Sequence, residues 1–242
     1  MEPRARRSLQ LGLILPRGAG PLAPLPVLAA RAGWQDLWVP AASSWPAQAV
    51  AAGMRGGWIV DAGELAPEPA SDIWIRGFST AAVAAQVARV ADRHQVSADA
   101  IDATAAASIR SAGAVPVFGP APIEALLALL RDSAGSGIVC LPASPGRTVA
   151  EACARLANDL GLRAEAEAAP ALVGTLEDCQ RSVAELYAAG MRELRLRLPA
   201  TPDIPDVIAQ MSALRGEALS GLRAGMPRSP APAAPEDWGG RT

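Results

Sequence analysis

The sequence has no lysine, one histidine and few aromatic residues, and each shortage narrows what the chain can do. All 22 basic residues are arginine and face 24 acidic residues, which leaves a net charge of −2. This balance gives no electrostatic case for binding nucleic acid. Aromatic residues make up only 4% of the 242 positions, so alanine, valine and leucine must build most of the core.

Metal and redox motifs are also missing. Cys140, Cys153 and Cys179 are widely spaced and odd in number, and His94 is the only histidine. They form neither a zinc-ligand pattern nor a paired-cysteine motif. Buried thiols in a reducing compartment are expected, which favours a cytoplasmic protein. His94 stands among polar residues at the end of an expected helix, which is typical of a solvated side chain.

Long apolar runs are absent as well. No stretch reaches the ~18 uninterrupted apolar residues of a membrane span. Arg6 and Arg7 precede an apolar run, but that run ends at Pro16, and it is too short for most export signals. The motifs Gly-x-Ser-x-Gly and Gly-x-Gly-x-x-Gly do not occur, which argues against a serine hydrolase and against a dinucleotide-binding fold.

What the sequence does contain is an alternation of short apolar strands and amphipathic helices. Strands are predicted near residues 9–15, 36–39, 57–60, 73–76, 115–118, 137–141, 170–173 and 193–198. This order predicts an α/β fold with one parallel sheet. Its size fits a small or partly degenerate (β/α)8 TIM-like barrel, and an open doubly wound sheet is the alternative. Residues 1–222 are assigned to the barrel and the Pro/Ala-rich residues 223–242 to a disordered tail.

The clearest unit covers residues 173–198 and reads as a strand end, a helix and a strand. Thr175 suits the N-cap of the helix, and Gly190 suits the left-handed position that ends it. Leucines at positions 194, 196 and 198 then alternate with two arginines, which is the period of a strand.

These two arginines, Arg195 and Arg197, face the side of the strand opposite to the leucines. If the leucines pack under helices, both arginines point into the barrel. A guanidinium there needs an anion, which would be a carboxylate such as Asp61 or a cofactor phosphate.

The same region resembles a known family. Val-Gly-Thr-x-Glu-Asp at 173–178 and Ala-Ala-Gly-Met-x-Glu-Leu at 188–194 resemble the C-terminal part of the luciferase-like flavin-dependent oxidoreductases. Thr-Pro-Asp-Ile-Pro-Asp at 201–206 is similar to the closing segment of their deazaflavin-using branch. Ala-Gly-Trp at 32–34 followed by Leu-Trp-Val-Pro at 37–40 resembles the opening of the family.

The resemblance implies a barrel oxidoreductase or monooxygenase that acts on a small molecule with FMN or an F-420-type deazaflavin coenzyme. A small-molecule substrate is then the expected partner, with a homodimer left open and neither nucleic acid nor membrane involved. Family members commonly follow the second strand with an acidic residue and a histidine, where this chain has Ala41 and Ala42. No catalytic residue is therefore assigned, and a degenerate, non-catalytic barrel that serves as a binding or assembly partner is the alternative.

Two stretches between a strand and a helix are candidates for cofactor binding, because barrel enzymes bind ligands at the carboxyl ends of strands. Gly119 lies in the first, where Pro120 has no N–H to donate. The second contains Ser144, Gly146, Arg147 and Thr148, which offer a hydroxyl, a glycine, a guanidinium and a helix N-terminus to a phosphate. Against this reading, a capping box of Thr148 with Glu151 would fill the same helix end.

The tryptophans are numerous for so few other aromatic residues. The sequence holds six Trp beside one Tyr and two Phe, and five lie on or near the early strands. Packing in the core is expected for each, and stacking on an isoalloxazine-type ring is the alternative. These five are Trp34, Trp38, Trp45, Trp58 and Trp74.

Overall fold

The computed structural model describes residues 9–15, 25–41, 47–64, 72–77, 79–133, 137–159, 172–199 and 204–213. Its strands are β1 (Gln10–Ile14), β2 (Asp36–Pro40), β3 (Arg55–Asp61), β4 (Asp72–Arg76), β5 (Gln95–Asp99), β6 (Val115–Phe118), β7 (Gly137–Gly146), β8 (Leu172–Thr175) and β9 (Met191–Arg197). Its helices are α1 (Leu25–Arg31), α2 (Ala47–Ala51), α3 (Thr80–Val90), α4 (Ala103–Ser111), α5 (Ile123–Asp132), α6 (Val149–Asn158) and α8 (Leu176–Ala188). Residues 204–213 are also helical.

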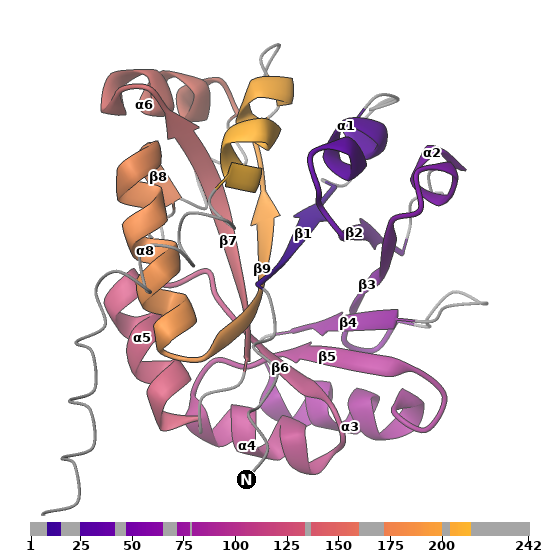
Figure 1. The fold of residues 1–242 in the computed structure, drawn as a ribbon. Coiled ribbons are helices and arrows are strands. Elements are labelled where there is room, and N and C mark those ends of the chain that lie inside the picture. The colour runs from indigo at the N-terminus through magenta and orange to yellow at the C-terminus, as the bar shows by residue number, and fades with distance from the viewer. Residues whose placement is uncertain are drawn as a thin grey trace, which may run out of the picture.

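Eight of these strands close into a parallel barrel. Strands β1 to β7 are neighbours in chain order, and β9 closes the ring by pairing with β7 on one side and β1 on the other. β8 is not part of the ring. Helices surround the strands (Figure 1). The protein is therefore a (β/α)8 TIM-like barrel, as predicted, and the closed ring excludes the open doubly wound sheet.

One predicted strand, β8, lies outside the ring, and the ring contains one strand, β5, that was not predicted. β8 pairs in parallel only with residues 143–146 of β7 within the described part of the chain. The missing barrel strand is β5, whose sequence Gln-Val-Ser-Ala-Asp has too few apolar residues to be found as an apolar run. His94 consequently lies in the turn that leads into β5 rather than on a helix.

Two apolar clusters flank the barrel wall. The larger lies between the strands and the helices, and the leucines at 194, 196 and 198 belong to it, together with Val183 and Leu186. The smaller fills the barrel interior and consists of Trp38, Ile59, Trp74, Val117 and Ile138. Strand alternation separates the two sets, because successive side chains point to opposite faces of a sheet.

The tryptophans divide between these clusters. Trp38 and Trp74 are buried inside the barrel, Trp34 is buried under the helices, and Trp58 packs against the same outer cluster. Core packing is thereby confirmed for these four. Trp45 lies outside the described residues.

The ends of α8 form as the sequence predicted. The Thr175 hydroxyl accepts a hydrogen bond from the Asp178 N–H at 3.2 Å, and the Asp178 carboxylate accepts one from the Thr175 N–H at 3.3 Å. The Thr175 hydroxyl also donates to Asp178 Oδ2 at 2.6 Å. This bond first, and the bond from the Thr175 N–H second, hold the pKa of Asp178 below its usual value. Gly190 follows the helix with a φ of 118°, a conformation that glycine adopts without strain.

None of the helices in the described ranges is both long and apolar enough to cross a bilayer. Residues 1–8 at the amino terminus, the tail at 223–242 and position 42 of the Ala41-Ala42 pair lie outside those ranges.

Candidate functional site

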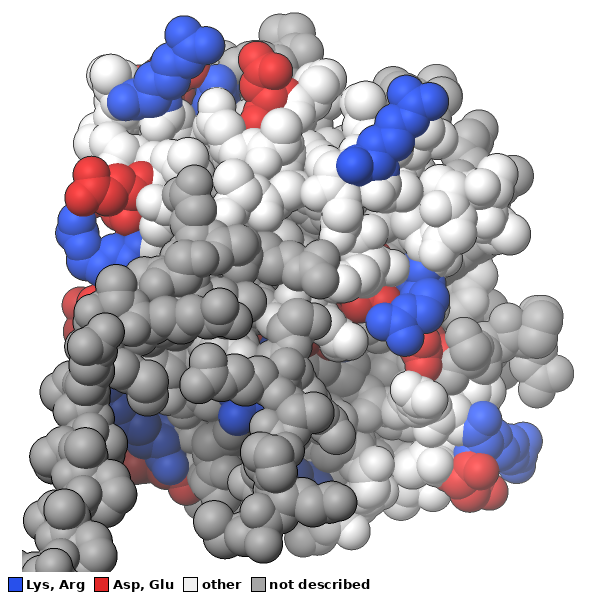
Figure 2. Space-filling model, viewed as in Figure 1, with Lys and Arg blue, Asp and Glu red and all other residues white. Residues whose placement is uncertain are grey.

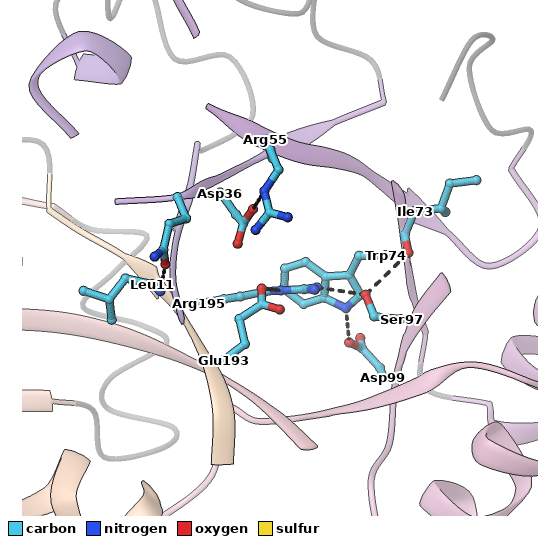
Figure 3. Close-up of polar contacts among 10 residues, drawn as sticks. Leu11, Asp36, Arg55, Ile73, Trp74, Ser97, Asp99, Glu193 and Arg195 are labelled. Carbon is cyan, nitrogen blue, oxygen red and sulfur yellow. Dashed lines mark hydrogen bonds and ion pairs between the residues drawn. The ribbon is translucent and has the colours of Figure 1, made fainter. Parts of the chain in front are cut away.

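The middle of the barrel interior is occupied by the side chain of Arg195, which is only 1% exposed. Its Nε donates to Glu193 Oε1 at 2.6 Å and its Nη1 donates to Ser97 Oγ at 3.0 Å (Figure 3). Its Cζ lies 3.6 Å from the ring centroid of Trp38 and 4.9 Å from that of Trp74. A buried guanidinium needs such partners, because leaving water is costly for a charge.

Arg195 therefore points into the barrel, as expected once the leucines pack under the helices. The carboxylate that it contacts is Glu193, two residues earlier on the same strand, rather than Asp61. Arg197 lies two residues further along β9 at the carboxyl end of the barrel, on the same face as Arg195 by strand alternation.

Gly12 makes room for this stack. A Cβ on Gly12 would lie 3.2 Å from Trp38 Nε1 and 3.4 Å from Arg195 Cγ, so a larger residue would displace one of them. The Trp38 and Trp74 rings meet edge to face, with centroids 6.1 Å apart and planes at 88°. Trp38 Nε1 is buried and has no hydrogen-bond partner in the described structure.

Carboxyl groups gather at the amino end of the barrel. Asp36 and Asp72 begin their strands, and Arg55 Nε lies 3.6 Å from Asp36 Oδ1. Burial first, and the charge of Glu193 second, raise the pKa of Asp36, while Arg55 and Arg195 lower it, and the net result is a pKa of about 6. Burial likewise raises the pKa of Asp72. Among the described residues no group of His, Cys, Asp or Glu is arranged to hold a metal ion.

Asp99 is a titratable group at the opposite, carboxyl end of the barrel. Its Oδ1 accepts a hydrogen bond from Trp74 Nε1 at 2.7 Å (Figure 3). Its Oδ2 accepts one from the Gly77 N–H at 3.3 Å. Arg76 Nε lies 3.9 Å from the same Oδ2, and the Arg76 side chain is half exposed. Barrel enzymes carry out their chemistry at this end, so Asp99 is a candidate acid–base group.

The pKa of Asp99 is consistent with such a role. Burial raises it from its ordinary value to about 6, although the Trp74 hydrogen bond, Arg76, the Gly77 N–H and Arg195 all lower it. A carboxyl with this pKa exchanges its proton close to neutral pH, which is the condition that acid–base catalysis requires.

Strand register places further charged residues at the carboxyl end. Asp61 and Arg76 are partners at the ends of β3 and β4, and Arg197 is the partner of Pro142 at the end of β9. Both signs of charge are therefore present there. Figure 2 shows scattered charged side chains and no broad patch of one sign among the described residues on the side of the molecule that it presents.

Ser144 and Gly146, two of the residues predicted to bind phosphate, belong to β7 rather than to a loop, because β8 extends the sheet beside them. The Ser144 hydroxyl donates to the Ala152 carbonyl at 2.8 Å. A Cβ on Gly146 would lie 2.8 Å from Ala152 N, so α6 fills the space beside this glycine.

The start of α6 is capped by its own residues. Thr148 Oγ1 accepts from the Glu151 N–H at 3.2 Å, and Glu151 Oε2 accepts from the Arg147 N–H at 2.8 Å. Glu151 Oε1 also pairs with Arg155 Nη2 at 2.6 Å, and Arg155 donates a further hydrogen bond to the Pro145 carbonyl. The carboxylate predicted to fill this helix end does so, while the side chain of Arg147 is exposed.

Gly119, the remaining predicted site residue, directly follows β6 and lies beside β7. It has a φ of 121° and a cis peptide bond to Pro120. A Cβ at this position would lie 2.2 Å from the Cys140 carbonyl oxygen. Only glycine allows this approach of the two strands, so the residue has a structural reason of its own.

Sequence reasoning missed Asp99 and Ser97 because it did not recognise the strand that carries them. The available signal was the alternation of polar Gln95, Ser97 and Asp99 with small apolar residues between them. That period is the one expected for a strand with a polar inner face.

Comparison with known proteins gives matches in structure alone. No family model and no curated protein matches the chain. An F420-dependent secondary alcohol dehydrogenase in complex with an F420-acetone adduct is similar over 87% of this chain and 99% of its own, at a TM-score of 0.64 and 10% identity. The coenzyme F420 dependent tetrahydromethanopterin reductase from Methanopyrus kandleri is similar over 85% of this chain and 97% of its own, at a TM-score of 0.62 and 8% identity.

A third similar structure is monooxygenase RslO1 from Streptomyces bottropensis, which matches 89% of this chain and 100% of its own at a TM-score of 0.60 and 14% identity. The shared feature is the barrel. At these identities the likeness establishes the fold and leaves the function to be argued from the site.

Proposed function

We propose that the protein is an oxidoreductase that exchanges hydride between a small molecule and a flavin-type cofactor at the carboxyl end of its barrel. The observation that carries the proposal is the contact between Trp74 and Asp99 at that end, where an indole holds a largely buried carboxyl whose pKa is about 6. A bound cofactor would supply or accept the hydride, while the chain would bind, orient and manage protons.

The choice of cofactor is supported by the sequence resemblance at 173–206 and by the neighbours. Two of the three similar structures carry F420 in their names, so an F-420-type deazaflavin is preferred over FMN. A small-molecule substrate, a cytoplasmic location and a homodimer complete the proposal. Cys179 is buried, as expected for the thiols, and its burial raises its pKa to about 12, whereas Cys153 is exposed. The buried Cys179 suits an unreactive thiol in a reducing compartment.

The proposed phosphate contacts lie at the ends of β6 and β7. The hydroxyl and backbone groups of Ser144, Gly146 and Thr148 already bond within the chain or face α6. They would shape the site together with Gly119, which directly follows the neighbouring strand β6. The exposed guanidinium of Arg147 is the group proposed to bind the phosphate directly, because a charge-assisted contact needs no rearrangement of the helix start.

Titration calorimetry of the full chain with FMN and with the F-420-type deazaflavin tests this function. Binding of either cofactor, followed by a change in its absorption spectrum when a reducible substrate is added, is the expected result. If the protein binds neither cofactor at millimolar concentration, the oxidoreductase proposal fails.

A degenerate barrel that serves as a binding or assembly partner is the second candidate. It is favoured by Ala41, whose N–H extends the sheet by donating to the Ile59 carbonyl and whose side chain has no acid–base group. The internal bonding of residues 144–151 also favours it. The same titration separates the two candidates, because only the oxidoreductase requires cofactor binding.

A further inference from the structure

We propose that Asp99 is the catalytic acid–base residue of this site, and that the substrate is a small carbonyl compound or its secondary alcohol. This inference rests on the proposed hydride transfer. It goes further by naming the group that moves the proton and the functional group that reacts.

The position of Asp99 is the first support. It is the last residue of β5, and its side chain is 22% exposed at the carboxyl end of the barrel. Trp74 and the Gly77 N–H each bond one of its two oxygens. The carboxyl is thus held in one orientation yet is accessible to a substrate and to solvent.

The surrounding charges are the second support. Arg76 from β4 approaches Asp99 to 3.9 Å, and Arg195 from β9 acts on it from the middle of the barrel. Both favour the carboxylate, whereas burial favours the neutral acid. The balance leaves both forms populated near neutral pH, so the residue can donate a proton in one direction and accept it in the other.

The substrate class follows from what one such group can do. If a bound deazaflavin supplied a hydride to a carbonyl carbon, a C–H bond would form and the π electrons of the C=O bond would move to oxygen. That oxygen forms its O–H bond with the proton of Asp99, and the O–H bond of the carboxyl breaks. The products would be an alcohol, the Asp99 carboxylate, which takes a proton from solvent, and the oxidised cofactor, which releases one proton to solvent. Oxidation of a secondary alcohol runs the same steps in reverse.

Trp74 is a positioning residue in this scheme. Its indole N–H favours the charged form of Asp99, and its ring is fixed edge to face against Trp38. Trp74→Phe keeps an aromatic ring but removes the donor. The pKa of Asp99 should then rise, and the limb of the pH–rate profile assigned to Asp99 should move to higher pH.

The test uses the full chain, reduced F-420-type deazaflavin and acetone as the probe, with single-turnover absorbance for the rate and calorimetry for cofactor binding. Asp99→Asn should lower the rate by ~10²–10⁴-fold and leave the cofactor Kd within about twofold. The matched control is Asp102→Asn at the exposed N-cap of α4, where asparagine caps as well as aspartate does, and it should leave the rate unchanged.

The outcomes separate this inference from the proposed function. Absence of cofactor binding by the unaltered chain overturns the proposed function and this inference with it. Cofactor binding without acetone reduction overturns the carbonyl substrate class. Reduction by Asp99→Asn within about threefold of the unaltered rate overturns the role of Asp99. If Asp99→Asn does not fold, a Trp74→Phe profile that coincides with that of the unaltered chain overturns it instead.

Discussion

The two faces of the barrel wall are built from different chemistry. Towards the helices, β9 presents buried leucines in a continuous apolar layer, whereas towards the interior the same strand presents Glu193 and Arg195. The outer layer gains its stability from apolar area removed from water. The interior depends on charge pairing and ring contacts, and it also sets the protonation of Asp36 and Asp99. The outer face therefore stabilises the fold, and the inner face determines the electrostatics of the barrel interior.

The largest effect is expected from breaking the interior pair. Arg195→Ala removes the partner of Glu193 and the cation between two indoles. It should cost about 3–5 kcal/mol, because an unpaired buried carboxylate remains. Denaturant melts measure this loss, with exposed Arg89→Ala on α3 as the control. The double variant with Glu193→Gln should recover part of the loss. Equal losses in the single and double variants would contradict the pairing argument.

The outer layer should respond through cavity formation alone. Leu196 is fully buried, and Leu196→Ala should cost roughly 2–5 kcal/mol through lost transfer energy and the cavity left behind. The matched control is Val149→Ala at an exposed position of α6, which should change stability by under about 0.5 kcal/mol. A loss below about 1 kcal/mol for Leu196→Ala would show that this site is not core. Unlike Arg195→Ala, this loss should not depend on pH.

A smaller effect should appear in the pH dependence of stability. The pKa of Asp36 is raised in the folded protein to about 6 from its ordinary 3.8, so folding binds a proton between these values. The contribution of this group is complete below pH 4 and is lost as pH rises through 6. Asp36→Asn should therefore stabilise the protein at pH 7.5 by on the order of 1–2 kcal/mol and leave it unchanged at pH 4.

Thermal melts at the two pH values measure this difference. Asp178→Asn is the opposite control, because the pKa of Asp178 is lowered in the folded protein, and its contribution is lost as pH falls. A stabilisation by Asp36→Asn that is equal at both pH values would rule out titration of Asp36 as the cause.

The smallest effect on stability is expected at Arg147, which belongs to neither face of the wall. Arg147→Ala should weaken cofactor binding at least about tenfold if the guanidinium contacts a phosphate. The melting temperature of the free protein should move by about 1 °C or less, since exposed substitutions change stability little. Calorimetry and melts give the two numbers, and exposed Arg131→Ala on α5 is the control. Unchanged binding would remove Arg147 from the site.

The outer face was readable from the sequence because its residues repeat with the period of their element. The leucines that alternate around Arg195 and the capped helix from Thr175 to Gly190 are two such patterns. With similar patterns along the chain, they predicted seven of the eight barrel strands. β5 escaped because only its inner face carries chemistry and its outer residues, Val96 and Ala98, are small. Local pattern therefore finds strands with a large outer face and misses those without one.

The site could be predicted only in part. Arg195 was expected to point inward, but its partner depends on the choice between neighbouring carboxylates, which strand alternation does not decide. Residues 143–146 were expected in a loop, but they extend β7 because β8 pairs with them. That pairing joins segments far apart in the chain, so the local sequence does not reveal it. The pKa of Asp99 reflects burial and side chains from two other strands, β4 and β9. Each of these features is set by long-range contacts rather than by neighbours in the chain.

The strand that closes the ring also has a consequence for how the molecule forms. β9 pairs with β1 and β7, and its contact with β1 joins positions 10 and 193. Contacts of such long sequence separation slow folding, because the intervening chain must be ordered before they form. A nascent chain that has not yet emerged as far as residue 191 presents β1 and the first half of β7 as open sheet edges. Open edges of this kind can pair with other chains, so β9 protects both edges as soon as it joins the sheet.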